Sequence, residues 1–201
     1  YNQFDTIYHE HFSYLSLMTV ERIFAAHGLH VFDVEELQTH GGSLRIYARH
    51  AGDPSVNERI LNLRSIEADA GLSDIGTYAN FGSRVQATRN ALLEFLGTAK
   101  QNGKRIAAYG APAKGNTLLN YCGIGKEFID FTVDRSPAKQ GRFLPGTRIP
   151  ILAPAALLDA RPDYVLILPW NIKDEITARM PQVREWGGQF VVPIPAVEII
   201  E

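Results

Sequence analysis

The chain has 201 residues with a formal net charge of −2 at pH 7; 45% of the residues are hydrophobic and 21% are charged. This composition is typical of a globular protein, and the length fits one large domain or two small ones. The balanced charge, without a cluster of Lys and Arg, argues against a nucleic-acid partner and against a polybasic membrane surface. No apolar run approaches the length of a membrane span, and no signal peptide is visible.

The single cysteine, Cys122, excludes an internal disulfide framework. It fits a reducing compartment, so we expect a cytoplasmic protein. Cys122 lies in an apolar helical pattern, and we interpret it as a small buried hydrophobic residue. The chain begins at Tyr1 rather than at a methionine, within sequence that has a structured pattern. We therefore expect that a part N-terminal to Tyr1 is missing.

The first half of the chain has the pattern of an α+β segment with long helices. Ser16 can cap a helix that ends at Gly28, and two strands should flank the Gly41-Gly42 pair. Asp53-Pro54 is a good start for the next helix, which should run to about Ala70. The expected strands cover 29–33 and 43–47, and a further long helix covers about 77–101.

From Lys104 onward, short apolar strands alternate with helices. Strands are expected at 105–110, 128–133, 164–168 and 190–192, with helices from about Gly115, from Pro154 and after Asn171, which can cap the last helix to about 187. This alternation indicates a parallel sheet covered on both faces. The predicted class is therefore α/β, with an α+β segment over 1–103 and a Rossmann-like unit over 104–201 that can pack as one domain. In such sheets ligands bind beyond the carboxyl ends of the strands.

Four hydrogen-bonding side chains stand in a row from Tyr8 to His11, and burying them is costly unless they are paired. In a helical turn Tyr8 and His11 would meet, whereas in a strand Tyr8 and Glu10 would share a face. A histidine beside a carboxylate and a phenol suits proton transfer, because imidazole titrates near neutrality and the phenol can donate to an oxyanion. A structural hydrogen-bond network is the alternative. A metal site would need further ligands that the sequence does not cluster nearby, so we predict none.

A glycine-containing turn, Gly110 to Gly115, leads from a strand into a helix. The first turn of a helix offers free amides and a positive dipole end, which suit a phosphate or a carboxylate. Lys114 would add a charge, and Asn116 or Thr117 a hydrogen bond. The stretch matches neither the dinucleotide pattern nor the P-loop pattern. A tight turn without a ligand is the alternative.

Other candidates lie after strands or beside glycines. Asp134 follows the second strand of the predicted sheet, where Rossmann folds hold a ribose, but it can also cap the turn. Lys139 and Arg142 suit a diphosphate, or they are solvated loop charges. His40 beside Gly41 is either a ligand contact or a turn residue, and Trp170-Asn171 offers a stacking surface or ordinary packing.

Four stretches, in the same order and with similar spacing, resemble the C-terminal region of nucleotide-sugar C-methyltransferases: Tyr8–Tyr14, Thr39–Arg45, Tyr109–Tyr121 and Asp134–Gly146. The resemblance implies an enzyme with an N-terminal zinc segment, a central domain that holds S-adenosylmethionine, and a C-terminal Rossmann-like domain. The nucleotide sugar would lie between the last two. The zinc cysteines and the cofactor domain are absent from this sequence, so we expect the chain alone to bind no S-adenosylmethionine and to be inactive.

By this resemblance His11 is the base that removes a proton beside a sugar keto group, and Tyr8 and Glu10 assist it. The expected substrate-binding residues are Gly110, Ala113, Lys114, Asn116, Asp134, Arg142, His40 and Asn171. The expected partners are the nucleotide sugar and the upstream methyltransferase domain, and a homodimer is compatible with the sequence. Two alternatives are a non-catalytic Rossmann-like nucleotide-binding module and an assembly domain that uses the helices of residues 54–102 as a dimer surface.

Overall fold

The computed structural model describes residues 2–50 and 52–200. The chain forms two compact units. Residues 1–11 and 83–201 make up the first, here called the Rossmann-like unit, and residues 12–82 make up the second, here called the hairpin unit. The sequence predicts a division at 103/104 instead. The grouping differs because Phe4 and the apolar side of helix α3 (Ile75–Gln101), which includes Leu92 and Leu96, are buried in the Rossmann-like unit.

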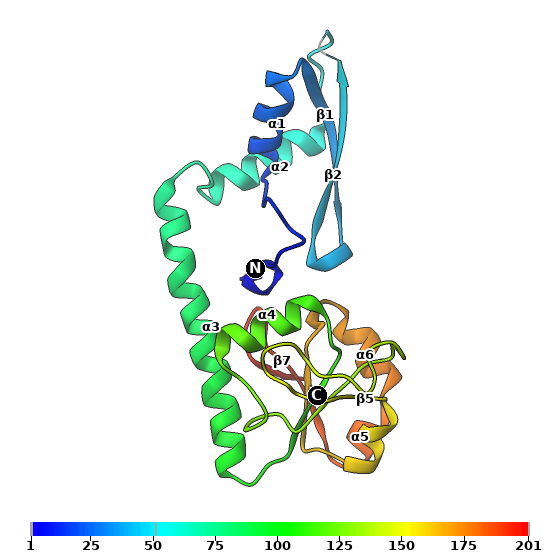
Figure 1. Cartoon of the computed structure of the whole chain (residues 1–201). Helices are drawn as coiled ribbons and strands as arrows, with labels where there is room; N and C mark the ends of the chain where they lie inside the picture. The colour runs from blue at the N-terminus through cyan, green and yellow to red at the C-terminus, as the bar shows by residue number, and fades with distance from the viewer. Residues whose placement is uncertain (1, 51, 201) are drawn as a thin grey trace. The chain divides into compact units, whose positions relative to one another are not determined.

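The Rossmann-like unit is built on a six-stranded sheet (Figure 1). The strands are β3 (Ile106–Tyr109), β4 (Thr132–Val133), β5 (Ile151–Leu152), β6 (Tyr164–Ile167), β7 (Gln189–Val192) and β8 (Glu198–Ile200). Their order is β5-β4-β3-β6-β7-β8; strands β5 to β7 pair in parallel, and β8 is antiparallel to β7. This mostly parallel sheet confirms the predicted α/β class.

Uniformly apolar segments explain why the central strands were predictable. Every residue of β3 is buried, and Val165 to Ile167 of β6 are also buried. The predicted strand over 128–133 is wrong in its first part, because the amides of Phe128 and Ile129 donate to the carbonyl of Gly125 in a turn. Only the last two residues of that segment pair as β4.

The helices of this unit are α4 (Ala113–Cys122), α5 (Ala155–Ala160), α6 (Lys173–Arg179) and α7 (Gln182–Glu185). The single last helix, predicted with Asn171 as its cap, is wrong on two counts. Pro181 separates α6 from α7, since proline fits a helix start but not a helix interior. The N-cap of α6 is Ile172, and Asn171 accepts a hydrogen bond from Lys114 instead. Cys122 is buried as predicted, and burial raises the pKa of its thiol to about 11.

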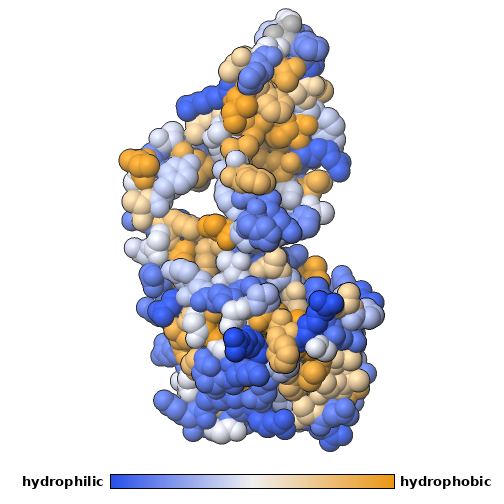
Figure 2. All heavy atoms as spheres, viewed as in Figure 1, coloured by the Kyte–Doolittle hydropathy of each residue, from blue (hydrophilic) through white to orange (hydrophobic). Residues whose placement is uncertain are grey.

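The hairpin unit contains α1 (Leu17–Ala26), β1 (Leu29–Leu37), β2 (Ser43–His50) and α2 (Glu58–Asp69), and β1 pairs antiparallel with β2. Ser16 caps α1 as predicted, accepting from the amide of Thr19 at 3.3 Å. The buried carboxylate of Glu67 accepts from the amides of Leu17 and Met18 at 2.6 and 2.9 Å, so α2 caps the same helix end. Figure 2 shows hydrophobic residues gathered over α1 and β1.

The predicted start of α2 at Asp53-Pro54 is wrong. The carboxylate of Asp53 accepts from the amide of Ser55 at 2.8 Å, which forms a local turn. The cap is Asn57, whose side chain accepts from the amide of Arg59 at 3.1 Å. A local hydrogen bond thus uses the first candidate cap and delays the helix.

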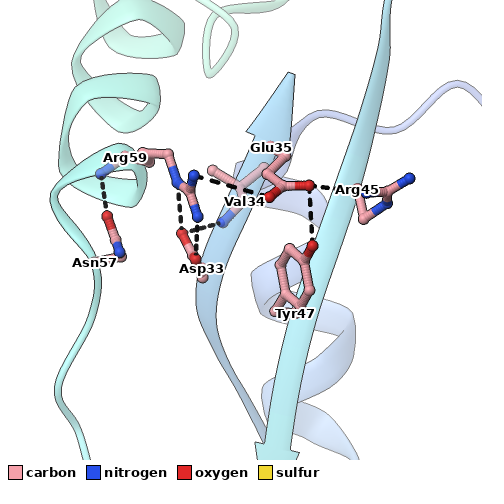
Figure 3. Close-up of polar contacts among 7 residues, drawn as sticks. All are labelled: Asp33, Val34, Glu35, Arg45, Tyr47, Asn57 and Arg59. Carbon is pink, nitrogen blue, oxygen red and sulfur yellow. Dashed lines mark hydrogen bonds and ion pairs between the residues drawn. The ribbon is translucent and has the colours of Figure 1, made fainter. Parts of the chain in front are cut away.

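A polar network crosses the hairpin unit from α2 to β2 (Figure 3). Arg59 of α2 donates to both carboxylate oxygens of Asp33 and lies 3.9 Å from Glu35. Glu35 also accepts from Arg45 at 3.0 Å and from the Tyr47 hydroxyl at 2.9 Å. The hydrogen bond from Arg59 holds the pKa of Asp33 below its ordinary value. The network links residues of three elements on a partly exposed surface.

No helix in the described part of the chain is long and apolar enough to cross a membrane.

Candidate functional site

The segment just before Tyr8 is fastened to the Rossmann-like unit at several points. The side chain of Asn2 donates to the Arg84 carbonyl and to the Thr88 hydroxyl, at 3.0 and 2.8 Å. Phe4 begins the short helix η1 (Phe4–Thr6), is buried, and packs against Tyr121 of α4 with ring centroids 5.1 Å apart. The first residues of the chain therefore contact residues of α3 and α4 that are far away in sequence.

Tyr8 to His11 forms a turn, which is the helical alternative considered from the sequence. The amide of His11 donates to the Tyr8 carbonyl at 3.0 Å. The two rings meet edge to face, with centroids 4.6 Å apart. Glu10 and His11 are exposed, whereas Tyr8 is partly buried. The phenol and the imidazole thus form one side-chain pair.

Tyr8 and His9 line a pocket of about 380 Å³. This is within the size range of small-molecule sites. The other lining residues follow β3 or belong to the loop before β5 and to β5 itself: Ala111, Pro112, Ala113, Asn116, Thr117, Lys139, Arg142, Phe143, Leu144, Pro145 and Ile151. The charged side chains among them, those of Lys139 and Arg142, are both cationic, so the pocket suits an anionic ligand with an apolar part.

Asn116 lines this pocket, but its side-chain oxygen is shielded from solvent. Its Oδ1 has no hydrogen-bond partner among the described residues. A buried acceptor without a partner is costly. The neighbouring Asn120 ties α4 to the loop, donating to the carbonyls of Asn116 and Pro145 at 2.8 and 3.1 Å.

Asp134 organises the turn after β3. One carboxylate oxygen accepts from the Ala111 amide at 2.8 Å and from Lys139 at 3.2 Å, and the other accepts from the Ser136 amide at 2.8 Å. Burial alone would raise the pKa of Asp134, but these hydrogen bonds outweigh it and leave the pKa below its ordinary value. The observed contacts correspond to the turn-capping alternative; a ribose contact remains a prediction.

Gly110 and Gly115 allow the turn to pack closely on the end of β6. Gly110 has φ of +91°, and a Cβ there would lie 2.6 Å from Pro169 Cδ. A Cβ on Gly115 would lie 2.7 Å from Leu168 Cβ. Both glycines are therefore needed for backbone packing. The first turn of α4 begins after Pro112, whose side chain has no acceptor to cap it.

Lys114 does not line the pocket. Its ammonium lies 4.5 Å from the centre of the Trp170 ring and donates to Asn171. The Trp170 indole N–H donates to the buried carboxylate of Asp5 at 2.7 Å. Trp170 and Asn171 belong to η3 (Trp170–Ile172), which follows β6. The anchor cluster, as it is called here, consists of Asp5, Lys114, Trp170 and Asn171.

The structure therefore divides the predicted residues. Tyr8, Ala113, Asn116 and Arg142 line the pocket, Lys114 and Asn171 belong to the anchor cluster, and Gly110 and Asp134 shape the turn. His40 lies in η2 (Thr39–Gly41) of the hairpin unit, and its role stays a prediction. Within residues 2–50 and 52–200, no cluster of His, Cys, Asp or Glu is arranged to hold a metal ion.

Sequence reasoning missed Asp5 and the pocket residue Phe143. Asp5 stands among ordinary polar residues and gives no motif, and its partner Trp170 is 165 positions away. Phe143 sits in the basic loop and is 59% exposed. An aromatic residue between basic residues was a usable signal for a nucleotide site.

Comparison with known proteins gives a consistent family. The model of the C-methyltransferase C-terminal domain family matches residues 38–195. The chain is 42% identical over 200 residues to C-methyltransferase NovU of Streptomyces niveus, and this alignment covers 99% of the chain and 48% of NovU. The chain thus spans about half the length of that relative. Tyr8 to His11 precedes the family match but falls within the NovU alignment. The chain belongs to the family of C-methyltransferase C-terminal domains.

Proposed function

We propose that this chain is the substrate-binding and proton-abstracting part of an S-adenosylmethionine-dependent C-methyltransferase that acts on a keto nucleotide sugar. The observation that carries the proposal is the turn that pairs Tyr8 with His11 beside a pocket with cationic side chains. Of the proposed catalytic residues, Tyr8 lines this pocket, and His11 packs against Tyr8. A cytoplasmic location is part of the proposal, because the unpaired Cys122 fits a reducing compartment.

In this mechanism His11 removes a proton from the sugar carbon beside the keto group. The electron pair moves onto the keto oxygen, and the Tyr8 hydroxyl donates a hydrogen bond to that oxyanion. The edge-to-face contact of the two rings keeps the base and the donor in a fixed relation. Glu10, next to His11 in sequence, has an assisting role by the resemblance. The product of these steps is an enolate whose carbon is the nucleophile that a C-methylation requires.

The pocket would hold the nucleotide. Arg142 and Lys139 provide positive charge for the diphosphate, and the uncapped first turn of α4 at Ala113 adds backbone donors. Phe143 offers a face for the base, and Asn116 lines the same pocket. His40 and Asp134 remain proposed substrate contacts, His40 from the resemblance and Asp134 also from its position directly after β4.

None of the described residues that line the same pocket has a carboxylate to hold the sulfonium of S-adenosylmethionine. The sulfonium of that cofactor is a cation, whereas the charged side chains that line the pocket, Lys139 and Arg142, are cations as well. The proposal therefore assigns the methyl donor to another part of the protein. The chain alone is expected to bind nucleotide but to transfer no methyl group.

The second candidate is a non-catalytic nucleotide-binding module of the dinucleotide type. A dinucleotide would occupy the crevice where the strand order reverses, and Asp5 and Trp170 lie there instead. Calorimetry with thymidine diphosphate and with NAD separates the two. The proposal expects thymidine diphosphate to bind and NAD to bind far more weakly; tight NAD binding would favour the module.

The catalytic assignment is tested in the full-length enzyme with a thymidine-diphosphate-linked keto sugar and radiolabelled S-adenosylmethionine. His11→Gln should lower methyl transfer by about 100-fold or more, because general-base catalysis contributes about 10²–10⁴-fold. His27→Gln is the matched control, since His27 is an exposed histidine at the end of α1. Equal activity of the two variants would contradict the proposal.

A further inference from the structure

The anchor cluster occupies the place where this fold would by default bind a ligand. From β3 the chain passes through α4 to β4 and β5 on one side, and it later returns to β6 and β7 on the other side. The sheet order therefore reverses between β3 and β6, and ligands of open α/β sheets bind in the crevice at such a point. Lys114 follows β3 and Trp170 follows β6, and the side chain bonded to Trp170 is that of Asp5.

The cluster is costly in free energy. Asp5 is 0% exposed, and its Oδ1 has no hydrogen-bond partner within the described part of the chain. Burial raises the pKa of Asp5, although the Trp170 hydrogen bond and the Lys114 charge oppose this shift. Burial lowers the pKa of Lys114, although the charge of Asp5 opposes it. Near neutral pH both shifts oppose folding, so the ionisation of these two groups does not stabilise the fold.

Hydrogen bonds within the chain hold the backbone between Asp5 and the turn of Tyr8 to His11. The amide of Ile7 donates to the Phe4 carbonyl at 3.0 Å, and the amide of Tyr8 donates to the Thr6 carbonyl at 3.1 Å. The next turn, from Tyr8 to His11, follows directly. The backbone between the Asp5 carboxylate and Tyr8 is therefore held by local hydrogen bonds.

Lys114 connects the anchor cluster to α4, the helix that also contributes to the wall of the pocket. Lys114 and Asn116 both lie in the first half of α4, and Asn116 lines the pocket while Lys114 faces Trp170. The cluster thus connects the segment that carries Tyr8 to the helix that forms the pocket wall. Phe4 adds apolar contact to this attachment but no directional bond.

We propose that Asp5 is a positioning residue for the proton transfer: its hydrogen bond to Trp170, beside Lys114, sets the place of Tyr8 and His11 over the pocket. This inference rests on the proposed function. Asp5 acts through the catalytic pair and contacts no reacting atom. A directional bond at a buried point fixes position more narrowly than the packing of Phe4.

The test uses the full-length enzyme with Asp5→Asn, Trp170→Phe and the double variant. Asparagine keeps the size but removes the charge, and phenylalanine keeps a ring under Lys114 but removes the indole N–H. Asp159→Asn is the matched control, because Asp159 is an exposed carboxylate of α5 in the same unit. The substrates are the thymidine-diphosphate-linked keto sugar and S-adenosylmethionine.

Trp170→Phe should lower kcat by roughly 10- to 100-fold, since small displacements of catalytic groups have effects of this size. Asp5→Asn should lower kcat by a smaller factor, because the asparagine oxygen still accepts from the Trp170 indole N–H in a weaker, uncharged bond. KM and Tm should stay near the wild-type values, and the double variant should be no worse than the worse single variant, because both substitutions weaken the same bond. An unchanged kcat would overturn the proposal. A loss of kcat that is accompanied by a matching loss of Tm would also overturn it, since that result indicates a structural role.

A second readout needs no substrate. In the full-length enzyme labelled with ¹³C-histidine, the His11 imidazole signal is assigned with His11→Gln. Trp170→Phe should shift this signal, because it removes the bond to Asp5 and the ring centroids of Tyr8 and His11 lie only 4.6 Å apart in the anchored turn. If the wild-type enzyme transfers no methyl group, the proposed function fails and this readout alone decides the positioning role. An unmoved signal contradicts it.

Discussion

The pocket and the anchor cluster lie along the same rim of the sheet, but the pocket is open whereas side chains fill the space at the anchor cluster. The pocket is open, with Phe143 and Arg142 exposed and the Asn116 acceptor without a partner among the described residues. The anchor cluster fills the crevice that Rossmann-like folds leave for a ligand with Asp5 and Trp170. Strand topology alone points to the crevice, whereas the side chains leave open space only at the pocket among these two places. The proposed nucleotide site is therefore the pocket.

The largest expected effect comes from breaking the turn on which both regions depend. Gly110→Ala should lower the free energy of unfolding by about 2–5 kcal/mol, because it combines a strained positive φ with a Cβ that would lie 2.6 Å from Pro169. Gly97→Ala in α3 is the matched control: nothing lies within 4 Å of its Cβ, and alanine favours a helix. Urea unfolding measures both. Similar free energies of unfolding for the two variants would show that the close packing of Gly110 on Pro169 is not needed for stability.

A smaller effect is expected from a substitution in the pocket that leaves the anchor cluster intact. Arg142→Ala should weaken the binding of thymidine diphosphate by about 10- to 100-fold, since it removes a charged hydrogen bond to phosphate. Calorimetry checks this, with the exposed Arg161→Ala at the end of α5 as the control. Equal affinities of the two variants would place the diphosphate elsewhere.

The smallest effect concerns Asp134, whose carboxylate holds the turn from the side of the pocket. Its folded-state pKa lies below the ordinary value of 3.8, so its contribution to stability is present above that value and is lost as the pH falls through the folded pKa. Asp134→Asn should lower the free energy of unfolding by about 1 kcal/mol near pH 7.

The difference between wild type and Asp134→Asn should shrink as the pH is lowered from neutral to below 3.8. Urea unfolding at several pH values measures it. A difference that is the same at every pH would show that the carboxylate charge does not hold the turn.

These two regions also show what the sequence could and could not predict. The buried strands β3 and β6 were predictable because a continuous apolar run has few other uses. Tyr8, Asn116 and Arg142 were predictable pocket residues because each lies in a recognisable motif or loop.

The rest depended on contacts between distant residues. Lys114 was expected on a phosphate, but Trp170 and Asn171 draw it to the other side of α4. Asp5 gave no signal because nothing near it in sequence requires a carboxylate. Such an assignment needs the fold, since the bond to Trp170 joins residues that are 165 positions apart in sequence.

The central claim is that His11 is the base for proton abstraction, and deuterium exchange tests it most directly. The full-length enzyme is incubated in D₂O with a thymidine-diphosphate-linked keto sugar, and deuterium at the carbon beside the keto group is followed by NMR. The account predicts rapid exchange with wild type and a loss of about 100-fold or more with His11→Gln, while calorimetry shows that thymidine diphosphate still binds. Exchange at the wild-type rate in His11→Gln would contradict the account.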